Sequence, residues 1–191
     1  MDSTWKRDFR NRMEAFAAST QSAGEVVSIK VRVDSGCFHR EHSPRAYGII
    51  DEHLRANQSD DWRFEEHESG PELLVWVAAA TSTVTLAASV LNLVSTIIKA
   101  RSDGIARGDS AHAPIELVVR KVVSVEKVRE ETVLRLFPHD PAEPKQIEVA
   151  LTDGLTRLAT SGSVDEPAPK KRGKKDAKKS TSAVRNRRRS R

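Results

Sequence analysis

Apolar and polar residues alternate with two different periods in the first part of the chain. Four apolar residues follow the three- and four-residue spacing of one helix face: Trp5, Phe9, Met13 and Phe16. Four others alternate with polar residues, as in a strand with one face toward solvent: Val27, Ile29, Val31 and Val33. The chain is therefore expected to begin with an amphipathic helix that a strand follows.

Capping residues and further alternation predict the later elements. Ser43 precedes Pro44, which is typical of a helix with Ser43 at the N-cap and proline at its first position, and this helix should run to about Ala56. Apolar residues alternate with charged ones in three further segments, which predicts strands over 62–66, 115–120 and 131–137. The last two are joined by a short charged connection and should form a hairpin. A capping box at Asp140-Pro141-Ala142-Glu143 predicts a last helix. The apolar face of that helix should comprise Ile147, Val149, Ala150, Leu151, Leu155 and Leu158.

The longest stretch without a charged residue runs for 26 residues, from Leu73 to Ile98. As a single helix it would be about 39 Å long, against roughly 30 Å of bilayer hydrocarbon. On such a helix the weakly polar side chains share one face: Ser82, Thr85, Ser89, Asn92 and Thr96. Apolar side chains share the opposite face: Val77, Ala80, Val84, Ala87, Leu91, Val94 and Ile98. This two-sided pattern predicts a long apolar helix over 73–98 that packs on the sheet.

A single membrane span over the same residues is the alternative. Acidic residues precede the segment and basic residues follow it, so a spanning helix would leave the carboxyl terminus in the cytosol. The span would also separate the first two strands from the last two, and neither pair alone makes a stable sheet. The core helix is preferred for this reason.

These elements together predict an α+β fold, with a sheet of about four strands packed by helices. Three regions are expected: an amphipathic N-terminal helix over 1–22, an α+β domain over 23–162, and a disordered basic tail over 163–191.

The charge distribution sets the tail apart. Residues 163–191 hold 12 of the 32 Lys and Arg but 3 of the 27 Asp and Glu, a net charge of +9, while residues 1–162 carry −4. A segment so poor in large apolar residues cannot bury enough surface to fold. Its cations are expected to contact phosphates of nucleic acid without sequence preference, with an anionic membrane surface as a second possible partner. The expected contact residues are Lys170, Lys171, Arg172, Lys174, Lys175, Lys178, Lys179, Arg185, Arg187, Arg188, Arg189 and Arg191.

Cysteine content and the amino terminus indicate the compartment. The chain has one cysteine, which excludes a disulfide framework and fits a reducing environment. No apolar stretch typical of a secretion signal follows the first residues. A cytoplasmic location is therefore expected.

A resemblance extends over about residues 65–160. The stretch HESGPELLVWV, the apolar segment behind it, and the strands IELVVRKVV and TVLRLF resemble a small bacterial domain called the effector-associated constant component of conflict systems. The resemblance implies a non-enzymatic module that works beside protease-like or nucleotide-dependent effector proteins. It implies no catalytic residues.

Two groups of residues offer candidate chemistry. Cys37, His39 and His42 would suit Zn²⁺ if Glu41 or His67 supplied a fourth ligand. A polar loop before the Ser43 cap explains the same residues and is the preferred interpretation, so no metal or cofactor is predicted.

The second group is Gly108-Asp109-Ser110, which is similar to the nucleophile motif of some esterases. Its candidate bases are His112 and His139-Asp140. A turn made of Gly, Asp and Ser explains the triplet as well, so no catalytic residue is predicted. Trp5, Trp62 and Trp76 are expected in the core. The sequence therefore favours a non-catalytic adaptor with a protein partner of the effector type, and a membrane-anchored protein is the alternative.

Overall fold

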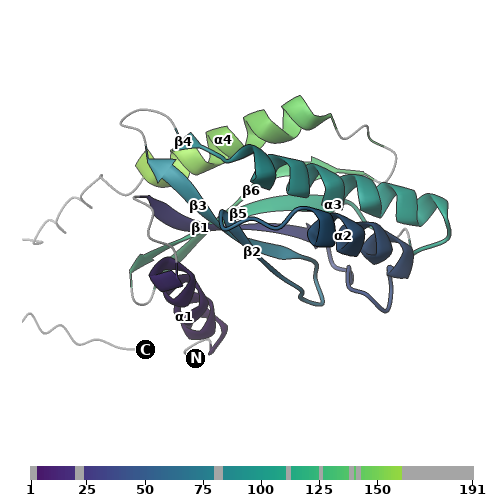
Figure 1. Cartoon of the computed structure of the whole chain (residues 1–191), viewed down its shortest axis with the longest axis horizontal. Coiled ribbons are helices and arrows are strands. Elements are labelled where there is room, and N and C mark those ends of the chain that lie inside the picture. Colours follow the sequence, from purple (N-terminus) through teal and green to yellow (C-terminus); the bar gives the residue numbers. More distant parts are fainter. Residues whose placement is uncertain are drawn as a thin grey trace, which may run out of the picture.

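A computed structural model of the chain describes residues 4–19, 24–79, 84–110, 113–124, 127–137, 140 and 143–160. Over these residues the protein has the expected α+β architecture (Figure 1). The elements are α1 (Thr4–Ser19), β1 (Glu25–Val33), α2 (Pro44–Ala56), β2 (Trp62–Glu65), β3 (Glu72–Ala79), β4 (Val84–Thr85), α3 (Ala88–Ala106), β5 (Ile115–Ser124), β6 (Lys127–Leu136) and α4 (Pro144–Thr160).

The strands form one six-stranded antiparallel sheet rather than the expected four strands. Its order is β2-β3-β1-β5-β6, and β4 pairs with β3 beside this path. The first strand of the sequence thus lies at the centre of the sheet. Figure 1 shows α2, α3 and α4 on one face of the sheet and α1 alone on the other.

The main core lies between the sheet and the three helices α2, α3 and α4. Alternate residues of β1 from Val27 to Val33 point into it, as the period-two pattern predicts. They meet side chains of α3 such as Leu93 and Ile97 and of α4 such as Leu151, all of which are completely buried. This layer of helix on sheet supplies most of the buried apolar surface.

The expected helix over 73–98 is wrong, because these residues contain strand β3 and the start of helix α3. β3 lies between β1 and β2 and is buried on both faces. Leu73 and Val75 join the main core, whereas Leu74 packs with α1. A strand with two buried faces shows no polar alternation, so its apolar run fits a helix equally well. None of the described helices is both long and apolar enough to cross a membrane.

The second, smaller core lies under α1. The helix buries Phe9, Met13 and Phe16, three residues of the predicted stripe. They pack on Leu74 and on partly buried residues of the sheet: Val26, Trp76, Val122 and Val128. Trp5, the fourth residue of the stripe, is instead 46% exposed.

Most of the other predicted elements are confirmed, with local differences. α2 begins at Pro44 and ends at Ala56, and β5 and β6 form the expected hairpin. The last helix begins at Pro144 instead of near Pro141. The face of β1 that was predicted to be exposed to solvent is largely buried, since both Ser28 and Lys30 are buried. The tail over 163–191 lies outside the described residues.

Candidate functional site

The face of the sheet that carries α1 has an apolar part and a charged part. α1 covers the apolar part through the second core. The charged part comprises six residues of β1, β3, β5 and β6, and we call it the charged sheet face: Lys30, Arg32, Glu72, Glu116, Arg120 and Glu130. Antiparallel register places these charges beside one another, because Arg32 pairs with Glu116 and Arg120 pairs with Glu130.

Glu72 is the buried centre of this face, with an exposed fraction of 1%. Its Oε1 accepts hydrogen bonds from Ser28 Oγ at 2.5 Å and Arg120 Nη1 at 3.1 Å. Its Oε2 lies 3.0 Å from His67 Nε2 and 3.5 Å from Arg12 Nη2. Burial alone would raise the pKa of Glu72. The contacts with His67 and Ser28 and the charge of Arg120 outweigh burial and lower this pKa to about 2.

The outer part of the charged sheet face is a ladder of ion pairs. Arg32 donates to Glu116 and to Glu130, both at 2.9 Å, and Arg120 donates to the other oxygen of Glu130 at 2.7 Å. The side chains of Arg32 and Glu130 are 30% and 34% exposed, so the ladder reaches solvent. Burial, with the nearby charge of Arg120, lowers the pKa of Lys30. A surface hollow of about 380 Å³ lies beside the ladder, and Arg32 and Arg120 are among the residues that line it.

α1 borders this face with an aromatic residue. The guanidinium of Arg120 lies 5.8 Å from the centre of the Trp5 ring and 6.0 Å from that of Phe9. Arg12 of the same helix forms an ion pair with Glu65, with 2.7 Å between its Nε and the carboxylate Oε2. Charges and rings together fix the position of the helix at the edge of the face.

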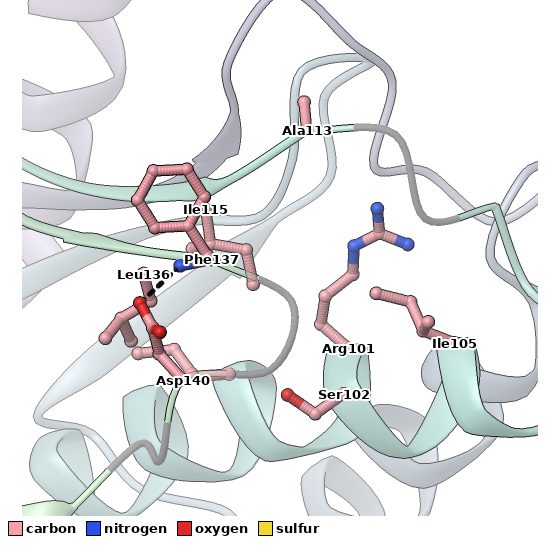
Figure 2. A pocket seen from close by; sticks show the side chains of 9 residues that line it. Arg101, Ser102, Ile105, Ala113, Ile115, Leu136, Phe137 and Asp140 are labelled. Carbon is pink, nitrogen blue, oxygen red and sulfur yellow. Dashed lines mark hydrogen bonds between the residues drawn. The ribbon is translucent and has the colours of Figure 1, made fainter.

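A second concave region lies between α3 and the end of β6, and Figure 2 shows its lining. Arg101 is 2% exposed there, and its Nη1 donates to the backbone oxygen of Ser110. Its Nε has no hydrogen-bond partner among the described residues, and its guanidinium lies 5.4 Å from the centre of the Phe38 ring. Burial lowers the pKa of Arg101 and the charge of Asp109 opposes this. The cavity measures about 10 Å³, which is enough for one water and too small for a ligand.

Gly108-Asp109-Ser110 has a structural role in which Asp109 caps a distant helix. Its Oδ2 accepts the backbone N–H of Ala46 at 3.0 Å, and its Oδ1 accepts that of Arg45 at 3.4 Å. These groups belong to the first turn of α2, where backbone donors lack partners within the helix. Ser43 occupies the N-cap position and Pro44 opens the helix, as predicted, but the Ser43 side chain makes no capping hydrogen bond. Of the candidate esterase bases, His112 and His139 lie outside the described residues.

The candidate metal ligands meet in one loop. Cys37, His39 and His42 place their ligand atoms within 4.8 Å of one another between β1 and α2. Neither proposed fourth ligand belongs to this group. Glu41 is exposed, and His67 faces Glu72 on the charged sheet face. The predicted nucleic-acid contacts from Lys170 to Arg191 lie outside the described residues.

The charged sheet face was missed by sequence reasoning. Lys30, Arg32 and Arg120 occupy alternate positions of strands, which is the usual pattern of a solvated face. The sequence does not give strand order, and strand order is what brings these residues together. Comparison with known proteins found no matching family model, no matching curated protein and no matching solved structure.

Replacement of Asp109 by alanine should lower the free energy of unfolding by about 2 kcal/mol, because two backbone donors of α2 lose their acceptor inside the protein. Chemical denaturation of the purified protein measures this loss. Ser110→Ala, one residue away and exposed, is the matched control and should change stability by less than about 0.5 kcal/mol. Equal losses in the two variants would contradict the capping role.

Acid should destabilise the protein through Glu72. The pKa of Glu72 is lowered from the usual 4.5 to about 2. Its contribution to the free energy of unfolding is therefore complete above pH 4.5 and is lost as the pH falls toward 2. This loss should amount to about 3 kcal/mol. Glu72→Gln should be less stable than the natural protein at pH 7, and the difference should shrink on acidification. Urea denaturation at several pH values tests this, and parallel stability curves would contradict it.

Proposed function

We propose that this protein is a non-catalytic adaptor that binds a protein partner through the charged sheet face and the adjoining surface of α1. The observation that carries the proposal is the exposed Trp5, which lies over Arg120 at the border of that face. Tryptophan and arginine are the residues most enriched among those that dominate binding energy in protein interfaces. Trp5, left 46% exposed at the border of a face whose Arg32 side chain is 30% exposed, gives this surface the composition of such an interface.

The ion-pair ladder supports the same surface. Arg32 pairs with both Glu116 and Glu130 at 2.9 Å, so the positions of these charges are set before any partner binds. Preorganised charges of both signs confer specificity on an interface, because a partner with the wrong charge pattern is repelled. The surface is also concave beside Arg32 and Arg120, so it offers a partner a distinct shape as well as a pattern of charges.

The partner class follows from the resemblance of residues 65–160 to the effector-associated constant component. On that basis we assign the adaptor to bacterial conflict systems, with an effector protein as its partner in the cytoplasm. The basic tail adds a second contact of low specificity, with nucleic acid as the polyanion. Its 12 cations within 29 residues are the feature that favours this contact.

Site-directed photo-crosslinking should distinguish the proposed interface from other surfaces. A photoreactive amino acid at position 5 of the full chain, expressed in its own cells, should form a crosslink to one discrete protein. The same residue at position 137 is the matched control, because Phe137 is also an exposed aromatic, 59% exposed, and directly follows β6, which ends at Leu136. Equal crosslinking from both positions, or none from position 5, would contradict the assignment. Mass spectrometry of the crosslinked band identifies the partner, and Arg32→Glu should abolish the crosslink from position 5.

Nucleic-acid binding should depend on the tail. A chain ending at Ser161 retains all of α4, which ends at Thr160, and should therefore keep its fold. It should lose its affinity for DNA and RNA, because residues 1–162 carry a net negative charge. For the full chain, affinity should fall by about 10³–10⁵ between 50 and 200 mM salt if six to ten phosphates are contacted. Gel-shift titration of both proteins at the two salt concentrations tests this, and undiminished binding by the shorter chain would place the contact on the folded part.

A further inference from the structure

The loop between β1 and α2 contains three potential metal ligands, and the residues next to these ligands hold the loop in place. Phe38 is completely buried, its N–H donates to the Glu68 oxygen at 2.8 Å, and its own oxygen accepts from the Tyr47 hydroxyl at 3.0 Å. Its ring also packs edge-on against Tyr47, with the ring centres 5.6 Å apart. This single residue therefore fixes the backbone between positions 37 and 39.

The following residues fix the rest of the loop. Arg40 forms ion pairs with Asp51 of α2 and with Glu66, and its guanidinium lies 5.0 Å from the centre of the Tyr47 ring. The N–H of Ser43 donates to the oxygen of His39 at 2.9 Å, which closes a turn just before α2. Metal sites gain affinity when their ligands are held in place before binding.

The three residues between these anchors converge. His42 Nδ1 lies 2.9 Å from His39 Nε2, and Cys37 Sγ lies within 4.8 Å of one ring nitrogen of each histidine. These two nitrogens are within hydrogen-bond distance of each other, and which of them donates depends on the tautomers of the two rings. Two imidazole ligands of a tetrahedral Zn²⁺ with 2.0–2.1 Å bonds stand about 3.3 Å apart. The separation of the two nitrogens therefore has to grow by only a few tenths of an ångström, together with a turn of the rings that points both lone pairs at one ion.

The surroundings of the loop favour a cation. The groove next to His39 is lined by three carboxylates, those of Glu41, Glu66 and Glu68. The one arginine in its wall, Arg40, is already neutralised by Asp51 and Glu66. The local field therefore attracts positive ions.

We propose that Cys37, His39 and His42 bind one Zn²⁺ ion per chain, with the fourth coordination position open to solvent or to a ligand from another molecule. A donor set of one thiolate and two imidazoles selects Zn²⁺ over Mg²⁺ and Ca²⁺, because these two ions take oxygen ligands. Cys37 and His42 are exposed and so reachable from solvent. Cys37 also lines the hollow beside Arg32 and Arg120, so the ion would lie at one end of the proposed interface. This site goes beyond the adaptor function and does not depend on it.

Zinc titration of the metal-free full chain against a chromogenic chelator tests the proposal. We expect one Zn²⁺ per chain. Loss of a supporting residue at a metal site costs about 10–100-fold in affinity, so Cys37→Ser, His39→Ala and His42→Ala should each weaken binding by at least about 100-fold. The matched control is His53→Ala on α2, whose ring contacts Thr96 outside the loop and which should bind zinc normally.

Two further readouts exploit the single cysteine of the chain. Zn²⁺ should slow alkylation of Cys37, and Co²⁺ in its place should produce a thiolate-to-cobalt absorption band that Cys37→Ser abolishes. Neither signal can come from another thiol. Both should be unchanged in a chain ending at Ser161, because residues 162–191 contain neither cysteine nor histidine.

The group Glu65, His67 and Glu72 is the competing site among the described residues. Arg12 and Arg120 already contact its carboxylates, and their charges oppose a metal ion there. Zinc binding that is lost in His67→Ala but kept in His39→Ala would therefore overturn the proposal. Absence of zinc binding by the natural chain, or alkylation of Cys37 at the same rate with and without zinc, would overturn it as well.

Discussion

The buried carboxylate of Glu72 is the interaction on which the arrangement of sheet and N-terminal helix depends. It joins Ser28 of β1, Arg120 of β5 and Arg12 of α1 at the first residue of β3. A buried charge is tolerated when it is paired and costs several kcal/mol when a partner is removed. Glu72 therefore also selects the register. If β3 moved by one residue, Glu72 would enter the apolar core and Leu73 would face the charges.

The same network determines what α1 can do. The helix buries three residues on the apolar part of the sheet, and Arg12 binds Glu65 and Glu72 beside it. With both sides of the helix fixed in this way, Trp5 is held over Arg120 although nearly half of its surface is exposed. The exposed ring is thus a consequence of how the helix is anchored. This is why a residue expected in the core belongs to the proposed interface.

Sequence patterns predict the elements that have one apolar and one polar face, and they fail for elements whose two faces are equally apolar. The stripe of α1 and the alternation of β1 each have one apolar face, and both elements were predicted correctly. From Leu73 onward β3 is apolar on both faces, so this part of the strand was predicted as part of a helix. Ser43 is the N-cap residue of α2 as predicted, but the side chain that accepts backbone donors there, Asp109, comes from 63 residues away, and local patterns do not reveal such a contact. The charged sheet face depends on strand order, and composition along one strand carries no information about strand order.

The proposed interface and the proposed metal loop share one support, the connection between β2 and β3. Glu66 and Glu68 of this connection hold the metal loop through Arg40 and the Phe38 backbone, and His67 between them faces Glu72. Gly70 follows with φ of +139°, and a Cβ at this position would overlap the carbonyl oxygen of Val31. Glycine thus lets the connection lie directly against β1. Because successive residues of one short segment contact the two sites in turn, a displacement of this segment would move the metal ligands and the charged sheet face together.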